Sequence, residues 1–142
     1  MDIRIATIDD LDLVVNMFCR FGENSPYKNY VGKEQITNVM KNILEADNNE
    51  KIILLHGEVG MIIGIATPFL YGPHIVATEL AWWVNPEARN SSVGKELLNA
   101  FEFWAKRVGC TLITMISLDD QLGNYYEKRG YSLFERAYMK EI

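Results

Sequence analysis

The sequence predicts an α+β protein with a central, mostly antiparallel sheet flanked by helices, in the order β-α-α-β-β-β-α-β-α-β. Three apolar stretches between residues 51 and 84 are separated by short turns, which is typical of an antiparallel meander. The segments before and after the meander carry apolar residues at helical spacing. Helices are therefore expected on the faces of a mixed sheet, within a single domain that spans residues 1–142.

The N-terminal third is expected to supply one strand and two helices. Thr7, followed three residues later by Asp10, matches the capping-box pattern that begins a helix. Ser25 and Pro26 lie in a stretch without helical periodicity, which indicates a loop. The expected elements are a strand at residues 3–7, a helix that runs to about residue 20, a loop at 22–32, and a helix from residue 33 that ends at 47–49.

The rest of the chain is expected to alternate strands and helices. Gly130, which follows Lys128 and Arg129, is a typical helix stop, because cations favour the last turn and glycine favours the C-cap. The expected elements are strands at 51–56, 61–70 and 74–84, a helix after residue 92, a strand at 111–117, a helix from about residue 119, and a final strand at 132–140.

Composition and charge exclude several classes of protein. Hydrophobic residues make up 49% of the chain and charged residues 23%, as in an ordinary globular domain. The apolar runs are too short to span a bilayer, and we expect no signal peptide. The net charge of −5 disfavours nucleic acid as a partner. Cys19 and Cys110 form no metal-binding spacing, so we expect buried free thiols, no metal and a cytoplasmic location.

A short polar loop, Arg89-Asn90-Ser91-Ser92-Val93-Gly94-Lys95, separates a predicted strand from a predicted helix. The first N–H groups of a helix have no partner within the helix, and they lie at the positive end of its dipole. Such a helix start suits a phosphate or pyrophosphate. Glycine at position 94 would let the backbone approach the anion closely and would permit unusual dihedral angles.

This loop resembles the acetyl-coenzyme A loop of the GNAT (Gcn5-related N-acetyltransferase) superfamily. The family signature is Gln/Arg-x-x-Gly-x-Gly/Ala after a strand that ends in Val-x-Pro. Val84-Asn85-Pro86 matches the strand end, Arg89 the first motif residue and Gly94 the last. Ser92 replaces the usual middle glycine, and its hydroxyl could donate to phosphate. The resemblance implies acetyl-CoA as co-substrate, bound by residues 89–95 and by the end of the strand, Trp82-Trp83-Val84.

A second match lies near the C-terminus. Tyr125-Tyr126-Glu127-Lys128-Arg129-Gly130-Tyr131 resembles the family's aromatic-Tyr-Glu-Lys-x-Gly-Phe/Tyr segment. In this resemblance Tyr126 falls on the general acid that protonates the departing thiolate, whereas Tyr125 is a packing aromatic. A phenol is a reasonable donor to a thiolate because its pKa of roughly 10 is close to the roughly 8.5 of a thiol and keeps it protonated at neutral pH. On sequence alone, a packing role for Tyr126 is the alternative.

Glu79 is the candidate general base. It interrupts an apolar strand, where a carboxylate is costly unless water or a partner satisfies it. Some GNAT enzymes place a glutamate on this strand to accept the amine proton through water. The alternative is a solvent-facing residue on the other face of the strand. Since adjacent strand residues point to opposite faces, one of Trp82 and Trp83 is expected in the core and the other in the wall of the acceptor cleft.

The predicted function is transfer of an acetyl group from acetyl-CoA to an amine by direct attack, with Tyr126 as general acid. The alternative is a non-catalytic acyl-CoA-binding or regulatory module with the same fold, which Ser92 and Asp119 favour. Asp119 replaces an asparagine that often contacts the cofactor in this family, and we expect it to cap a helix instead. The acceptor, a small molecule or a protein amine, would be walled by residues 22–32 and 72–75. A homodimer could form through the terminal strand near residues 134–139.

Overall fold

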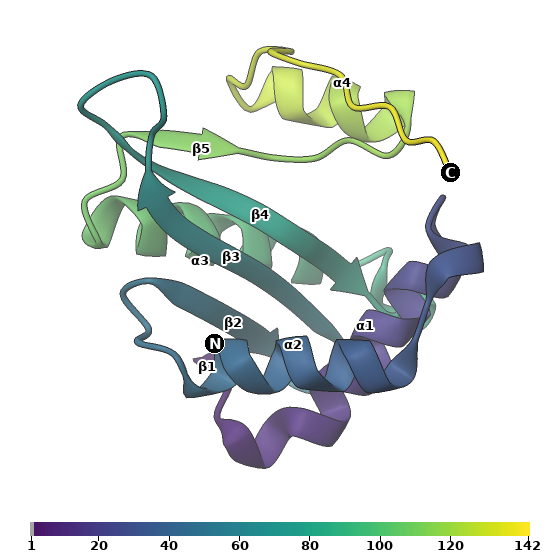
Figure 1. The fold of residues 1–142 in the computed structure, drawn as a ribbon. Helices are drawn as coiled ribbons and strands as arrows, with labels where there is room; N and C mark the ends of the chain where they lie inside the picture. Colours follow the sequence, from purple (N-terminus) through teal and green to yellow (C-terminus); the bar gives the residue numbers. More distant parts are fainter. Residues whose placement is uncertain (1) are drawn as a thin grey trace.

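The computed structural model describes residues 2–142 and has the predicted α+β fold, with a five-stranded sheet at its centre (Figure 1). The strand order follows the chain, β1-β2-β3-β4-β5, and every neighbouring pair is antiparallel except β4 and β5, which are parallel. The strands are β1 (Ile3–Ile5), β2 (Lys51–His56), β3 (Gly60–Pro68), β4 (Ile75–Val84) and β5 (Leu112–Thr114).

Helices cover both faces of this sheet and define two hydrophobic cores. Helices α1 (Leu11–Glu23) and α2 (Lys33–Glu45) pack against one face, around Ile53, Leu55, Ile63 and Trp83. Helix α3 (Val93–Arg107) packs against the other face, with Leu97, Leu98 and Phe101 fully buried. Helix α4 (Asp120–Lys128) lies beyond the β5 edge, at the top of Figure 1.

Local sequence signals explain several element boundaries. Thr7 and Asp10 form the predicted capping box, but they cap a 3-10 turn, Ile8–Asp10, that leads directly into α1. Asp119 caps α4 as expected, because its carboxylate accepts a hydrogen bond from the Leu122 N–H at 2.8 Å. Gly130 ends α4 with φ of 94°, the left-handed conformation that favours glycine. None of the helices within residues 2–142 combines the length and the apolar character needed to cross a bilayer.

The final strand expected at residues 132–140 is not formed. Every residue from Ser132 to the end is exposed and outside the sheet. An alternating pattern predicts a strand only where a neighbour can accept its backbone hydrogen bonds, and β5 pairs over only three residues. Cys19 and Cys110 are half-buried free thiols, not fully buried as expected, because each lies near the end of an element at the margin of a core.

Candidate active site

The candidate site begins where β4 and β5 separate. Their parallel pairing ends at Thr78 and Thr114, one residue before Glu79. The pairing of β4 with β3 shifts at the same place, from Glu79 opposite Gly64 to Ala81 opposite Ile63, which leaves Leu80 as an extra residue. A β-bulge of this kind bends a strand and redirects its side chains. The bulge and the end of the parallel pairing together open the sheet beside Glu79.

Glu79 is buried in this opening, with 3% of its surface exposed. Its Oε1 accepts a hydrogen bond from the backbone N–H of Ile116 at 3.2 Å. Burial raises the pKa of Glu79 to about 7, and the hydrogen bond from Ile116 offsets only part of that effect. The interpretation of Glu79 as a solvent-facing strand residue is therefore wrong. A carboxyl group that titrates near neutrality suits proton transfer at physiological pH.

Tyr126 lies on α4 and binds Ile116, the residue that also bonds to Glu79. Its hydroxyl donates a hydrogen bond to the Ile116 carbonyl at 3.1 Å, and its ring stacks on Trp82 with centroids 6.2 Å apart. Burial, and then the nearby charge of Glu79, raise the pKa of Tyr126 above its usual range. The phenol therefore remains protonated at neutral pH, as a proton donor must be before it acts.

A small cavity of about 40 Å³ joins Glu79 and Tyr126. It is lined by apolar and aromatic side chains together with these two polar ones: Phe21, Tyr27, Glu79, Leu80, Trp82, Ile116, Leu118, Leu122 and Tyr126. Residues 22–32 contribute Tyr27, as the sequence suggested, but residues 72–75 do not line the cavity. Phe21, Leu118 and Leu122 were missed. The positions of Phe21 on α1 and Leu122 on α4 indicate only an apolar helix face, and Leu118 lies in the segment before α4 without any motif.

The two tryptophans of β4 divide as expected between core and cavity. Trp83 is 4% exposed and belongs to the core under α1 and α2, where its Nε1 donates to the Asn85 Oδ1 at 2.8 Å. Trp82 lies on the opposite face of β4, in contact with the α3 core and the cavity. Its Nε1 is buried and has no hydrogen-bond partner within residues 2–142.

The loop after β4 holds Arg89 against the protein. The Arg89 Nε donates to the Val84 carbonyl at 2.8 Å, and its guanidinium lies 4.6 Å from the centre of the Trp83 ring. Arg20 approaches the same ring at 5.4 Å and donates to the Asn85 Oδ1 at 3.1 Å. Arg89 therefore fixes the turn that leaves β4, and its cation is held by an aromatic face. The side chains of Asn90 and Lys95 are exposed.

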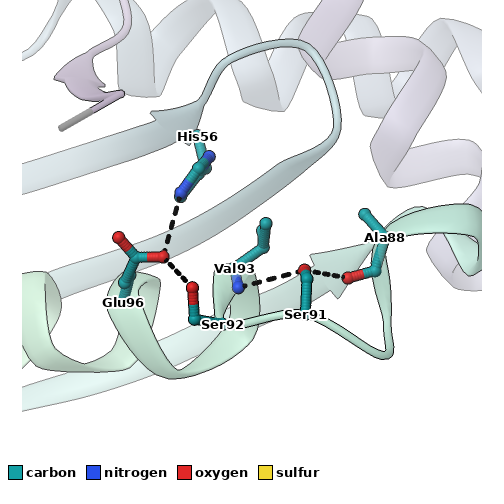
Figure 2. A network of polar contacts seen from close by, with 6 residues as sticks. All are labelled: His56, Ala88, Ser91, Ser92, Val93 and Glu96. Carbon is teal, nitrogen blue, oxygen red and sulfur yellow. Dashed lines mark hydrogen bonds and ion pairs between the residues drawn. The ribbon is translucent and has the colours of Figure 1, made fainter.

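The serines of the loop bond to the protein in the arrangement shown in Figure 2. Ser91 donates to the Ala88 carbonyl and accepts from the Val93 N–H at 3.3 Å. Ser92 donates to the Glu96 carboxylate at 2.5 Å, and the same Glu96 oxygen lies 3.4 Å from the His56 Nε2. The Ser92 hydroxyl is thus turned toward Glu96, where we had expected it to face a phosphate. This contact with Ser92, followed by that with His56, lowers the pKa of Glu96.

The backbone at the start of α3 retains unpaired donors. Within residues 2–142, the N–H groups of Gly94 and Lys95 make no hydrogen bond to the protein. Gly94 does not have a positive φ. The expectation that a glycine is needed here for an unusual backbone conformation is therefore wrong. A Cβ at position 94 would meet Val84 and Trp82 only at 3.5 and 3.6 Å, which is ordinary contact. The donors, and the absence of a side chain that would cover them, suit an anion such as a pyrophosphate.

The fold brings two kinds of chemical group together at the opening of the sheet. A helix start with free N–H groups can bind an anion, and a buried glutamate and tyrosine in one cavity can exchange protons with a bound molecule. No group of three or more His, Cys, Asp or Glu residues within the described chain is placed to hold a metal ion.

The chain belongs to the GNAT acetyltransferase family, because the model of that family matches residues 17–131. Among solved structures, a transcriptional regulator from Bacillus halodurans C-125 is 26% identical with a TM-score of 0.77, over 99% of this chain and 98% of that one. An aminoglycoside 6′-N-acetyltransferase from Acinetobacter haemolyticus is 20% identical with a TM-score of 0.75, over 100% and 99% of the two chains. A Trypanosoma brucei acetyltransferase is 19% identical with a TM-score of 0.73, over 99% and 98%. No curated protein matches the chain.

Proposed function

We propose that this protein is an acetyl-CoA-dependent N-acetyltransferase that transfers the acetyl group to an amine by direct attack. The observation that carries the proposal is the convergence of Glu79 and Tyr126 on one cavity, at the point where β4 and β5 separate. Family membership supports acetyl transfer in general. Trp82-Trp83-Val84 and the loop 89–95 are the proposed binding residues for acetyl-CoA, with the N–H groups of Gly94 and Lys95 as the phosphate donors.

In this proposal, the amine nitrogen bonds to the thioester carbonyl carbon and gives one proton to Glu79, directly or through water. The C–S bond then breaks, and the leaving sulfur takes one proton from the Tyr126 hydroxyl. Transfer of the proton from Glu79 to the tyrosinate restores both groups, so that the net products are an amide and a free thiol. The pKa of Glu79, raised by burial to about 7, allows it to accept a proton near neutral pH.

Thiol release from acetyl-CoA, followed with and without an added amine, tests this function. Amine-dependent release, together with detection of the acetylated amine by mass spectrometry, is the expected result. Thiol release that does not depend on any amine would contradict direct attack on the thioester.

The alternative is a non-catalytic acyl-CoA-binding or regulatory module with the same fold. The contact between Ser92 and Glu96 favours it, because this contact occupies a loop hydroxyl and places a carboxylate in the first turn of α3. The relative from Bacillus halodurans is described as a transcriptional regulator. Acetyl-CoA binding in calorimetry without any amine-dependent thiol release would support this alternative.

We further propose that the protein acts in the cytoplasm and forms a homodimer through its C-terminal segment, near residues 134–139. The free thiols of Cys19 and Cys110 fit a reducing compartment.

Phe134, Tyr138 and Met139 are exposed in the C-terminal segment. Burial of these side chains against a second copy would remove apolar surface from water. Light scattering at micromolar concentration should give the mass of two chains, and a monomer mass would contradict the dimer.

A further inference from the structure

The acceptor side of the cavity is an aromatic wall. Phe21 from α1 and Tyr27 from the loop after α1 line the cavity on one side, and Leu118 and Leu122 line it from the segment before α4 and from α4 itself. These four residues come from parts of the chain that meet only through folding. The wall therefore presents apolar and aromatic surface to whatever approaches Glu79 from outside.

The position of Tyr27 is fixed by its neighbour Ser25. Ser25 is buried, its hydroxyl donates to the Gly22 carbonyl at 2.6 Å, and its Oγ accepts from the Tyr27 N–H at 3.1 Å. The side chain of Tyr27 remains 40% exposed at the rim of the cavity. The bond to Ser25 fixes the backbone of Tyr27, so only its side-chain torsions remain to be ordered when the ring packs against an incoming apolar group.

The charge of the cavity limits the acceptor further. Among the residues that line it, Glu79 is the only carboxylate. A buried carboxylate can pair with one ammonium group, but a second cation, carried over the apolar residues at the rim, would meet no carboxylate among the lining residues, and this is costly. The cavity therefore suits an acceptor with one positive charge near the reacting nitrogen.

The size of the cavity places the rest of the acceptor outside it. A volume of about 40 Å³ leaves space for roughly three water molecules. Such a space admits the amine nitrogen and its attached carbon, together with the reacting carbonyl group. The remainder of the acceptor must then extend past Leu118 and Tyr27, over the aromatic wall.

We infer that the acceptor is a singly charged primary amine carried on an aromatic or other apolar group, with Tyr27 and Phe21 as the residues that select it. This inference rests on the proposed acetyl transfer. It disfavours amines with several charges, such as polyamines and aminoglycosides, because Glu79 is the only carboxylate among the residues that line the cavity.

Steady-state kinetics with 2-phenylethylamine, spermidine and kanamycin test the inference. We expect kcat/KM for 2-phenylethylamine to exceed the other two values at least tenfold. Preference for spermidine or kanamycin would overturn the inference but leave the proposed function intact. If no amine supports thiol release, the proposed function fails and the inference fails with it.

Substitutions of Tyr27 make the test specific to the wall. Tyr27→Ala should raise the KM for 2-phenylethylamine roughly tenfold and leave the KM for acetyl-CoA unchanged. Tyr30→Ala is the matched control, because Tyr30 belongs to the same loop, is exposed and does not line the cavity. Equal effects of the two substitutions would overturn the role of Tyr27. Tyr27→Asp, which adds a second carboxylate at the rim, should shift the preference toward spermidine, and an unchanged preference would contradict the charge argument.

Discussion

Glu79 and Tyr126 bind the two backbone groups of one residue, Ile116. The carboxylate of Glu79 accepts from the Ile116 N–H at 3.2 Å, and the hydroxyl of Tyr126 donates to the Ile116 carbonyl at 3.1 Å. Ile116 lies two residues after Thr114, the last paired residue of β5, so its backbone groups would otherwise lack partners at the opening. The two candidate catalytic residues thus also hold the segment that separates β5 from α4.

The pH dependence of turnover tests Glu79 as the base. A base with a pKa of about 7 is active when deprotonated, so kcat/KM should rise with pH through this value. Glu79→Gln should lower the rate at neutral pH and remove this rise, and part of the rate should return at higher pH as free amine accumulates. A pH–rate profile identical to that of the wild type would exclude Glu79 from proton transfer.

The stability of the fold should depend on the same carboxyl group. Because burial raises the pKa of Glu79 from an ordinary value of 4.5 to about 7, the folded state holds a proton that the unfolded state releases in this interval. The free energy of unfolding should therefore fall between about pH 4.5 and 7, by roughly 3 kcal/mol for a shift of this size.

Urea denaturation at pH 5 and pH 8 checks this prediction. Glu79→Gln keeps an oxygen that can accept from Ile116 but cannot ionise, so it should stabilise the protein at pH 8 and change little at pH 5. Glu45→Gln, at an exposed position on α2, is the control and should have little effect at either pH. A loss of stability in Glu79→Gln at pH 8 would show that the charged form of Glu79 is favoured in the fold.

Two substitutions of Gly94 test the proposed site for the pyrophosphate. Gly94→Glu places bulk and negative charge over the free N–H groups of α3 and should abolish acetyl-CoA binding in calorimetry. Gly94→Ala is the matched control, since its Cβ would meet Val84 and Trp82 only at ordinary contact distances. It should bind acetyl-CoA nearly as well as the wild type. Unchanged affinity in Gly94→Glu would rule out this loop.

The sequence was most informative where local chemistry decides the structure. The cap at Asp119, the stop at Gly130 and the bounds of β2 follow from side-chain bonds, backbone conformation and turn residues, all of which are local. The partner of Ser92 was not predictable in this way. A bound phosphate and the carboxylate of Glu96, one helical turn away, are both possible acceptors for its hydroxyl. Tyr27 reaches the cavity only through the packing of α1 and the bonds of Ser25. The missing strand at 132–140 shows that pattern alone does not supply a pairing partner.

Tyr126 is the most direct test of catalysis, because one oxygen atom separates its two interpretations. Tyr126→Phe keeps the ring against Trp82 but removes the proton donor and the bond to the Ile116 carbonyl. If the hydroxyl protonates the leaving thiolate, kcat should fall roughly 10²-fold or more, the usual scale for loss of a positioned acid. The affinity for acetyl-CoA should change little, because the loop at the start of α3 is untouched.

Tyr131→Phe is the matched control for Tyr126→Phe. The Tyr131 hydroxyl also lies in a partly buried hydrogen bond, to Glu102 at 2.6 Å, and its ring packs 5.6 Å from that of Tyr126, but it does not line the cavity. Its removal should leave kcat within a few-fold of the wild type, so that any general loosening around α4 is measured separately. Full turnover in Tyr126→Phe on an accepted amine would mean that Tyr126 only packs and that the thiolate leaves without its help. The general acid would then have to be another group, with water in the cavity as the first candidate.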